Sequence, residues 1–151
     1  MTLRQHLRDH EFTRGLSDVQ IDMLAAMSTK VSFEEDALIL EDGRRSEAFF
    51  LVVSGSVSVE LRTASYAVSV QAVGPGQAFG WSALLQDHDS LFQVRAREHT
   101  VALRLDGTAL KAACHTDTQL GTEILLRALE LVAGRVRATE VRFAEMCGVR
   151  A

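Results

Sequence analysis

Cysteine is scarce in this sequence of 151 residues, which contains only Cys114 and Cys147 and no CxxC pair. Two isolated cysteines build neither a disulfide framework nor a cysteine-ligated cluster, so we expect a reducing, cytoplasmic compartment. Long apolar runs are also missing, because none approaches the roughly 20 residues that span a bilayer. Residues 1–11 are polar and lack the apolar segment of an export signal. We therefore expect neither secretion nor membrane insertion.

An excess of positive charge is missing as well. The 16 Lys and Arg are outnumbered by 20 Asp and Glu, and the formal net charge is −4. Nucleic-acid phosphates are usually met by a basic face, so this balance argues against direct DNA binding. An apolar content of 47% is enough for a core, and the length is typical of one domain. Residues 1–151 are predicted to form a single domain, because no repeat or linker divides them.

The first part of the chain, about residues 1–30, is predicted to be helical. Ser17 is a suitable N-cap residue, and Gln20 three residues later completes a capping box. One predicted face of the helix that follows contains Val19, Met23, Ala26 and Met27.

Residues 31–105 are predicted to form short β-strands. Phe49 to Val53 is an apolar run, Val57 to Leu61 alternates with period two, and Gly74-Pro75-Gly76 is one of several turn signals. Many short strands with regular turns are typical of a sandwich or jelly roll. The predicted fold class is α+β and mostly β, a jelly-roll-like β-roll (double-stranded β-helix) flanked by helices.

Residues 106–147 are predicted to form helices, the first at residues 108–114. Thr116-x-x-Gln119 is a second capping-box pattern, after which nothing stops a long helix before Gly148 except isolated glycines. An apolar seam with the 4-3 spacing of heptad a and d positions follows this helix. Its members are Leu125, Leu129, Val132, Val136, Thr139, Phe143 and Met146.

The seam has two interpretations. Ile124, Ala128 and Leu131 form a second apolar face, which is available for packing on the chain's own β-roll. Beyond Val132 the other faces turn polar and include Arg135. We predict that the seam pairs with a second copy of the chain through residues 122–147, the alternative being a helix that packs only on its own domain.

Six segments, in this order and spacing, carry a resemblance to a known family: FEEDALILEDG (33–43), FLVVSGSVSV (50–59), GPGQAFG (74–80), ALL (83–85), VRA (94–96) and LRLD (103–106). The chain from about residue 12 to residue 146 resembles the cyclic-nucleotide-binding domain of the catabolite-activator (Crp–Fnr) superfamily. The resemblance implies N-terminal helices, an eight-stranded β-roll and a long C-terminal dimerisation helix. The segment GWSALL resembles stand-alone members that lack the helix-turn-helix domain.

By this resemblance, residues 76–96 correspond to the family's phosphate-binding cassette, G-E-[apolar]-[A/G]-L, a loop, then R-[S/T]-A. The Glu accepts a hydrogen bond from the ribose 2′-hydroxyl, and the Arg neutralises the cyclic phosphate. Gly80 matches the cassette glycine, but Trp81 stands where the Glu belongs. Ser90, Leu91 and Phe92 stand where the Arg, Ser/Thr and Ala belong.

The missing contacts predict a departed pocket, by which we mean a pocket that lacks the charged groups that bind a cyclic nucleotide in the family. Losing one side of a buried ion pair costs about 3–5 kcal/mol, so we expect cyclic AMP and cyclic GMP to bind weakly or not at all. Arg95 and Arg97, which share one strand face, are the substitutes that would allow genuine cyclic AMP binding. A further alternative is a structural interaction domain whose pocket is plugged by Trp81, Leu91 and Phe92.

The candidate pocket residues are therefore Gly80, Trp81, Ser82, Ala83, Ser90, Leu91, Phe92, Arg95 and Arg97. Residues 80–84 depart from the G-x-S-x-G nucleophile elbow at the fifth position, and no nucleophile–base pair appears, so no catalytic residue is predicted. His88 has no second His or Cys at ligand spacing, so no metal is predicted.

The sequence thus predicts a non-catalytic regulatory module without an obligate cofactor. Its expected partners are a second copy of itself, a small effector and another protein that responds to its state. Family transcription factors continue past the long helix into a helix-turn-helix domain, whereas this chain ends at Ala151, which adds to the expectation of no direct DNA binding.

Overall fold

The computed structural model describes residues 1–85 and 91–148. Helix α1 (Leu3–Asp9), the 3₁₀ helix η1 (Glu11–Thr13) and helix α2 (Asp18–Ala26) form the N-terminal part. The predicted capping box of α2 is confirmed, because Ser17 accepts a hydrogen bond from the Gln20 amide and the Gln20 side chain accepts one from the Ser17 amide. The buried residues of α2 are Ile21 and Leu24, which lie outside the face grouped from the sequence, and Val19 of that face is 69% exposed.

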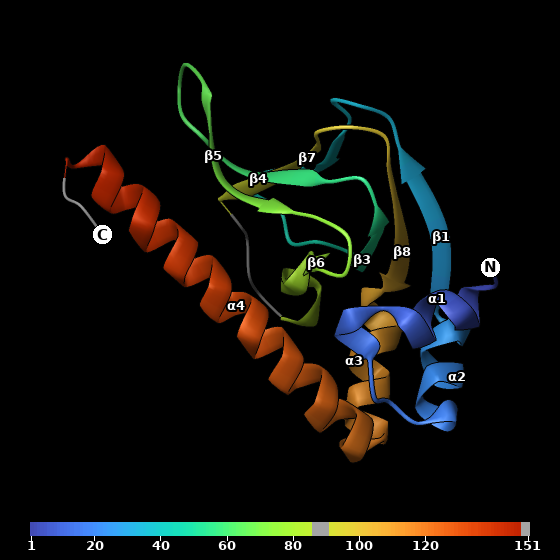
Figure 1. Ribbon diagram of the computed structural model, residues 1–151. Coiled ribbons are helices and arrows are strands. Elements are labelled where there is room, and N and C mark those ends of the chain that lie inside the picture. The colour runs from blue at the N-terminus through green and yellow to red at the C-terminus, as the bar shows by residue number, and fades with distance from the viewer. Residues whose placement is uncertain (86–90, 149–151) are drawn as a thin grey trace.

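Eight antiparallel strands build the centre of the described part of the chain (Figure 1). They are β1 (Ser28–Phe33), β2 (Leu38–Leu40), β3 (Ala48–Ser54), β4 (Val57–Arg62), β5 (Ala67–Val73), β6 (Ala78–Phe79), β7 (Phe92–Ala96) and β8 (Thr100–Asp106). One sheet has the strand order β1-β8-β3-β6 and the other has the order β2-β7-β4-β5. The predicted β-roll is therefore confirmed.

Strand β3 lies between two hydrophobic clusters, which explains why its sequence is apolar without alternation. Phe50 and Val52 pack with Phe79 and residues of the second sheet inside the roll, and the Phe50 and Phe79 rings stack at 4.8 Å. Phe49 and Leu51 point to the opposite face and pack against the helices. Successive side chains on a strand point to opposite faces, so one strand serves both clusters.

Two helices complete the chain, α3 (Gly107–Thr116) and α4 (Thr118–Met146). The predicted capping box at Thr116 is wrong, because Thr116 is the last residue of α3 and Asp117 is the N-cap of α4. The Asp117 carboxylate accepts hydrogen bonds from the amides of Gln119 and Leu120, and Asp caps a helix at least as well as Thr. Helix α4 leaves α3 and runs along one side of the roll (Figure 1).

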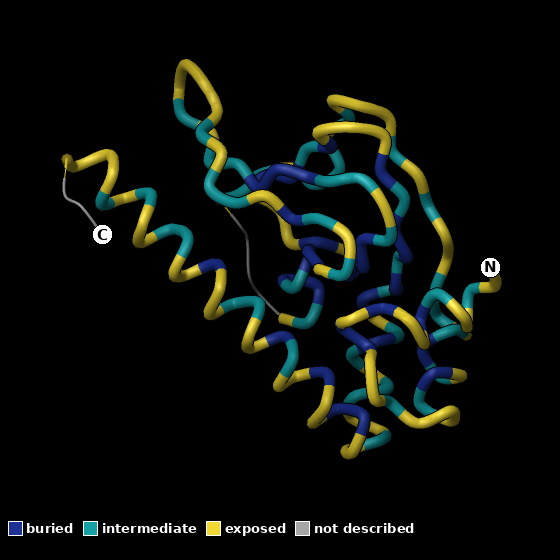
Figure 2. Tube along the Cα trace, in the orientation of Figure 1, coloured by how far each residue is buried: buried dark blue, intermediate teal, exposed yellow. Residues whose placement is uncertain are grey.

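Buried and exposed residues alternate along α4, which gives it an inner and an outer face (Figure 2), and both faces contain apolar residues. On the inner face, Ile124 and Ala128 are buried and Leu131 packs against the core, which confirms the second apolar face. The outer face carries the predicted seam. Its residues that are more than half exposed are Leu125, Leu129, Val136, Phe143 and Met146, and Val132 and Thr139 are partly buried.

Candidate functional site

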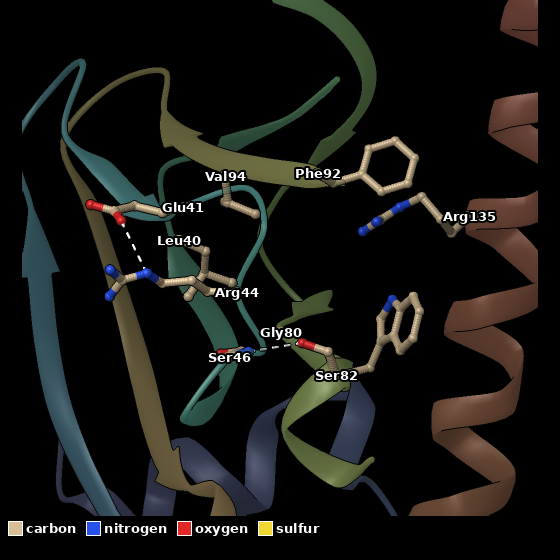
Figure 3. Close-up of a pocket in the computed structure, with 10 residues that line it drawn as sticks. Leu40, Glu41, Arg44, Ser46, Gly80, Ser82, Phe92, Val94 and Arg135 are labelled. Carbon is tan, nitrogen blue, oxygen red and sulfur yellow. Dashed lines mark hydrogen bonds and ion pairs between the residues drawn. The ribbon is translucent and has the colours of Figure 1, made fainter. Parts of the chain in front are cut away.

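A small enclosed space, here named the cassette cavity, lies between the roll and α4 (Figure 3). Its volume is about 30 Å³, which holds one or two water molecules. Pockets for drug-sized ligands have volumes of about 300–1,000 Å³, so the cavity, as lined by the described residues, is about tenfold smaller than such a pocket. It is lined by Leu40, Glu41, Arg44, Ser46, Gly80, Trp81, Ser82, Phe92, Val94 and Arg135.

Gly80 lines the cassette cavity at the start of a short helix. Its backbone is left-handed, with φ at 85°, and it begins the short 3₁₀ helix η2 (Trp81–Leu84). A Cβ at this position would lie 2.7 Å from the Ala48 carbonyl oxygen, so only glycine fits. The buried Ser82 hydroxyl accepts a hydrogen bond of 3.0 Å from the Ser46 amide, which ties η2 to the start of β3 (Figure 3).

Arg135 reaches into the cassette cavity from the inner face of α4 (Figure 3). Its Nε donates to the Gln71 side-chain oxygen at 2.9 Å, and its Cζ lies 5.2 Å from the centre of the Phe92 ring. Arg135 is 9% exposed, and burial lowers the pKa of its guanidinium to about 10. Within residues 1–85 and 91–148 it forms no ion pair, and its terminal nitrogens donate no hydrogen bond.

Sequence reasoning missed Arg135 and placed it among the polar faces of α4. The signal was present, because the inner face follows the series Ile124, Ala128, Leu131 with steps of four and three. The next step of four reaches Arg135. An arginine that continues a buried row indicates a buried charge.

A second arginine at the cassette cavity already has a carboxylate partner. The Arg44 Nε lies 3.7 Å from a carboxylate oxygen of Glu41 (Figure 3). Among the described residues that line the cavity, two arginines and one glutamate leave a single net positive charge, on the side of Arg135.

Four of the predicted pocket residues line the cassette cavity: Gly80, Trp81, Ser82 and Phe92. Ala83 is buried but does not line the cavity. It packs against Gly107, since a Cβ built on Gly107 would lie 3.0 Å from the Ala83 Cβ. Leu91 is 74% exposed and does not plug the cavity, since it precedes β7 and faces solvent. Ser90 and His88 lie outside the described residues.

The two substitute arginines lie away from the cassette cavity. Val94 lines the cavity, and strand alternation turns the next side chain, Arg95, to the opposite face of β7. There its Nε is 3.5 Å from a carboxylate oxygen of Glu60 and its Nη1 donates to the Asp36 carbonyl at 2.9 Å. Arg97, beyond the end of β7, is exposed.

No group of three or more His, Cys, Asp or Glu suited to a metal ion occurs in the part of the chain that the structure describes. In that same part, no helix has both the length and the apolar character that a membrane crossing requires.

The β-roll, the glycine-initiated η2 and the covering α4 together match a known domain. The family model described as the cyclic nucleotide-binding domain matches residues 30–117, which is more than half of the chain. The chain belongs to the cyclic nucleotide-binding domain family. No curated protein matches the sequence.

Solved members of the cyclic nucleotide-binding fold are similar over nearly the whole chain. A putative cyclic nucleotide-binding protein from Geobacter metallireducens has a TM-score of 0.78 and 24% identity, over 90% of this chain and 99% of that chain. A cyclic nucleotide-binding domain from Methylobacillus flagellatus has a TM-score of 0.76 and 19% identity, over 95% and 82%.

A third similar structure comes from a protein kinase regulator. It is a triple mutant of the regulatory subunit of a cyclic AMP-independent protein kinase A from Trypanosoma brucei, bound to cyclic AMP in its A site. The TM-score is 0.73 at 22% identity, over 96% of this chain and 50% of that chain.

Compared with the family's cassette, this cyclic nucleotide-binding domain has the same cassette glycine and different side chains at the ligand-contact positions. Gly80 retains the left-handed turn, and η2 follows it as the resemblance implies. Trp81, at the position of the Glu, and Phe92, at the position of the Ala, both line the cassette cavity. Arg135, the lining arginine that has no ion pair among the described residues, comes from α4 instead of the cassette.

Proposed function

We propose that residues 1–151 form a single, non-catalytic regulatory domain of the cytoplasm. Its pocket binds cyclic AMP and cyclic GMP weakly or not at all, and it signals through a homodimer formed by α4. The observation that carries this proposal is the cassette cavity, which has a volume of about 30 Å³ and walls formed by Trp81 and Phe92. A cyclic nucleotide needs several hundred Å³ and a carboxylate for its ribose.

The outer face of α4 supports the homodimer. Leu125, Leu129, Val136, Phe143 and Met146 form an exposed apolar row at heptad spacing. A contiguous apolar row on a helix surface marks an interaction site, and the matching row of a second copy is complementary by symmetry. Ligand-dependent changes at the inner face would then reach the partner through one rigid helix.

The Trypanosoma brucei relative supports a departed pocket by analogy. That protein is described as cyclic AMP-independent, yet its triple mutant, in which one threonine is replaced by arginine, binds cyclic AMP. A cyclic AMP-independent protein of this fold can therefore hold cyclic AMP in a variant that carries three substitutions. We apply the same logic to Trp81 and Ser90, which stand where the family has Glu and Arg.

The test is calorimetric titration with cyclic AMP and cyclic GMP. We expect no measurable binding by the wild type, and binding at least about 100-fold tighter by W81E/S90R, which restores both charged contacts. The single variant W81E, which enlarges the cavity without supplying the arginine, is the matched control and stays weak. Micromolar binding of cyclic AMP to the wild type would refute the departed pocket.

A structural interaction domain with a plugged pocket is the second candidate, favoured by the same small cavity. Trp81 is the only tryptophan, so its fluorescence reports on the cassette cavity alone. A regulatory pocket that opens to an effector predicts a fluorescence change with a member of a metabolite library. No response to any metabolite, together with no quenching by iodide, would favour the plugged domain.

A further inference from the structure

The guanidinium of Arg135 is a buried cation whose positive charge is not neutralised. It is 9% exposed, and its hydrogen bond to Gln71 is to a neutral amide. Within the described ranges 1–85 and 91–148, no carboxylate pairs with it. An uncompensated charge in a protein interior is costly, and interiors normally supply a partner or a ligand for it. The terminal nitrogens of this side chain face the cassette cavity (Figure 3).

The charge, shape and size of the cavity select one kind of ligand group. Among the described residues, the lining carries one net positive charge, because Glu41 pairs with Arg44, so a monoanion balances it. The flat guanidinium presents paired N–H donors that match the two oxygens of a carboxylate. A space of about 30 Å³ holds a group the size of a carboxylate and excludes a nucleotide.

The other residues that line the cavity are mostly apolar and would contact the apolar part of a carboxylate ligand. Leu40, Trp81, Phe92 and Val94 line the cavity with aliphatic and aromatic carbon. The Phe92 ring lies 5.2 Å from the Arg135 Cζ, so a flat body beside the carboxylate would meet an aromatic surface.

We propose that the cassette cavity binds a small monoanionic carboxylate, whose head group pairs with the terminal nitrogens of Arg135. The inference rests on the proposed function and names the class of its effector. Because Arg135 belongs to the inner face of α4 and Val136 to the outer face, ligand binding acts on the helix that carries the proposed dimer seam.

The test compares carboxylates with their neutral amides on the intact protein. Calorimetric titrations use sodium acetate and sodium benzoate against acetamide and benzamide, all at one ionic strength set with chloride. We expect acetate to bind and both amides not to bind, whereas benzoate, which is larger than the cavity, requires the cavity to open. R135Q is expected to weaken carboxylate binding at least about 30-fold. R137Q removes an exposed arginine of the same helix and is expected to change nothing.

The outcomes separate the carboxylate site from the proposed function. Equal binding of acid and amide, no binding of either carboxylate, or unchanged binding by R135Q would each overturn the site. Acetate binding without benzoate binding supports it and sets a size limit. If circular dichroism shows that R135Q does not fold, the comparison of carboxylates with amides on the wild type still tests the carboxylate site.

A cyclic AMP titration of the same samples completes the design. Cyclic AMP binding that is lost in R135Q, without carboxylate binding, would overturn both the carboxylate class and the departed pocket. Absence of cyclic AMP and carboxylate binding in a dimeric protein would leave the proposed function standing and overturn only the carboxylate site.

Discussion

The two faces of α4 contain similar apolar residues and have opposite surroundings. On the inner face Ile124 is 1% exposed and Ala128 is 6% exposed, whereas on the outer face Leu129 is 62% exposed. The inner row is explained by this chain alone, and it ends at a charged residue, Arg135, in the cassette cavity. Most of the outer row is more than half exposed within the described residues, and this exposed apolar row is the basis of the proposed homodimer. In our proposals, one helix joins the effector site to the assembly surface.

The largest expected effect is on the inner face. Ile124→Ala removes a fully buried side chain and should lower the free energy of unfolding by about 3 kcal/mol. The control Leu126→Ala, at a residue that is 56% exposed and off the seam, should cost less than about 0.5 kcal/mol. Urea unfolding at one protein concentration measures both. Equal losses would contradict the distinction between the two faces.

The outer face should control assembly instead of folding. Leu129→Glu places a charge in the middle of the seam and should weaken dimerisation by about 100-fold, with an unchanged circular dichroism spectrum. Leu126→Glu, also exposed but off the seam, is the matched control. Sedimentation equilibrium gives the dissociation constants. A wild type that stays monomeric at every concentration would refute the homodimer.

Alanine substitutions at two glycines of α4 test the distinction between its packed and its open side. They should change the free energy of unfolding in opposite directions. A Cβ at Gly121 would lie 2.4 Å from the Cys114 carbonyl oxygen, so Gly121→Ala should cost about 2 kcal/mol through displacement of α3. A Cβ at Gly134 would meet nothing within 4 Å, so Gly134→Ala should stabilise the helix by about 0.5–1 kcal/mol. Thermal unfolding of both variants is sufficient. A Gly121→Ala variant as stable as the wild type would show that α4 and α3 are not closely packed there.

Arg135 should behave as a functional residue whose burial is unfavourable. Its pKa falls to about 10 because burial disfavours the charged form of the guanidinium. The folded state therefore carries the full penalty at every pH below about 10, and neutral pH lies in that range. Arg135→Met should leave the free energy of unfolding unchanged or raise it by about 1 kcal/mol. A loss greater than about 2 kcal/mol would identify Arg135 as a structural residue.

Much of the fold was predictable because local signals and tertiary packing agree. The Ser17 capping box and the alternation in β4 are local features that the fold retains. Where two local signals compete, sequence alone cannot choose, and both Thr116 and Asp117 are acceptable N-caps. Helix α2 has apolar residues on several faces, and packing against the sheet selects Ile21 and Leu24 over Val19.

The site was less predictable because its residues come from distant segments. The resemblance located Gly80, Trp81 and Phe92, all of which lie within one motif. Arg135 follows Phe92 by more than 40 residues and reaches the cavity only because α4 folds back over the roll. Leu91 shares the motif but not the cavity, because side-chain direction at the start of a strand depends on register, which a motif does not encode.

The smallest expected effect concerns the hydrogen bonds that connect the inner face of α4 to the N-terminal segment around Phe12. Arg127 of α4 donates to the Phe12 carbonyl at 2.6 Å, and the Phe12 amide donates to Nδ1 of His10 at 3.1 Å. His10 Nε2 lies 2.8 Å from the Val52 carbonyl oxygen, to which it donates. Nδ1 accepts and Nε2 donates only in the neutral ring, so protonation breaks the contact with Phe12.

Burial lowers the pKa of His10 below 6.5, although the Val52 carbonyl and Glu11 oppose the shift. The unfolded chain therefore binds the proton more readily, and the free energy of unfolding should fall as the pH drops through 6.5. Above about pH 7.5 the histidine is neutral in both states and contributes no pH dependence. His10→Gln should reduce the loss of stability between pH 7.5 and 5.5 relative to the wild type, whereas His115→Gln, at an exposed histidine, should not. Identical pH profiles for the wild type and His10→Gln would show that the inner face of α4 is anchored independently of His10.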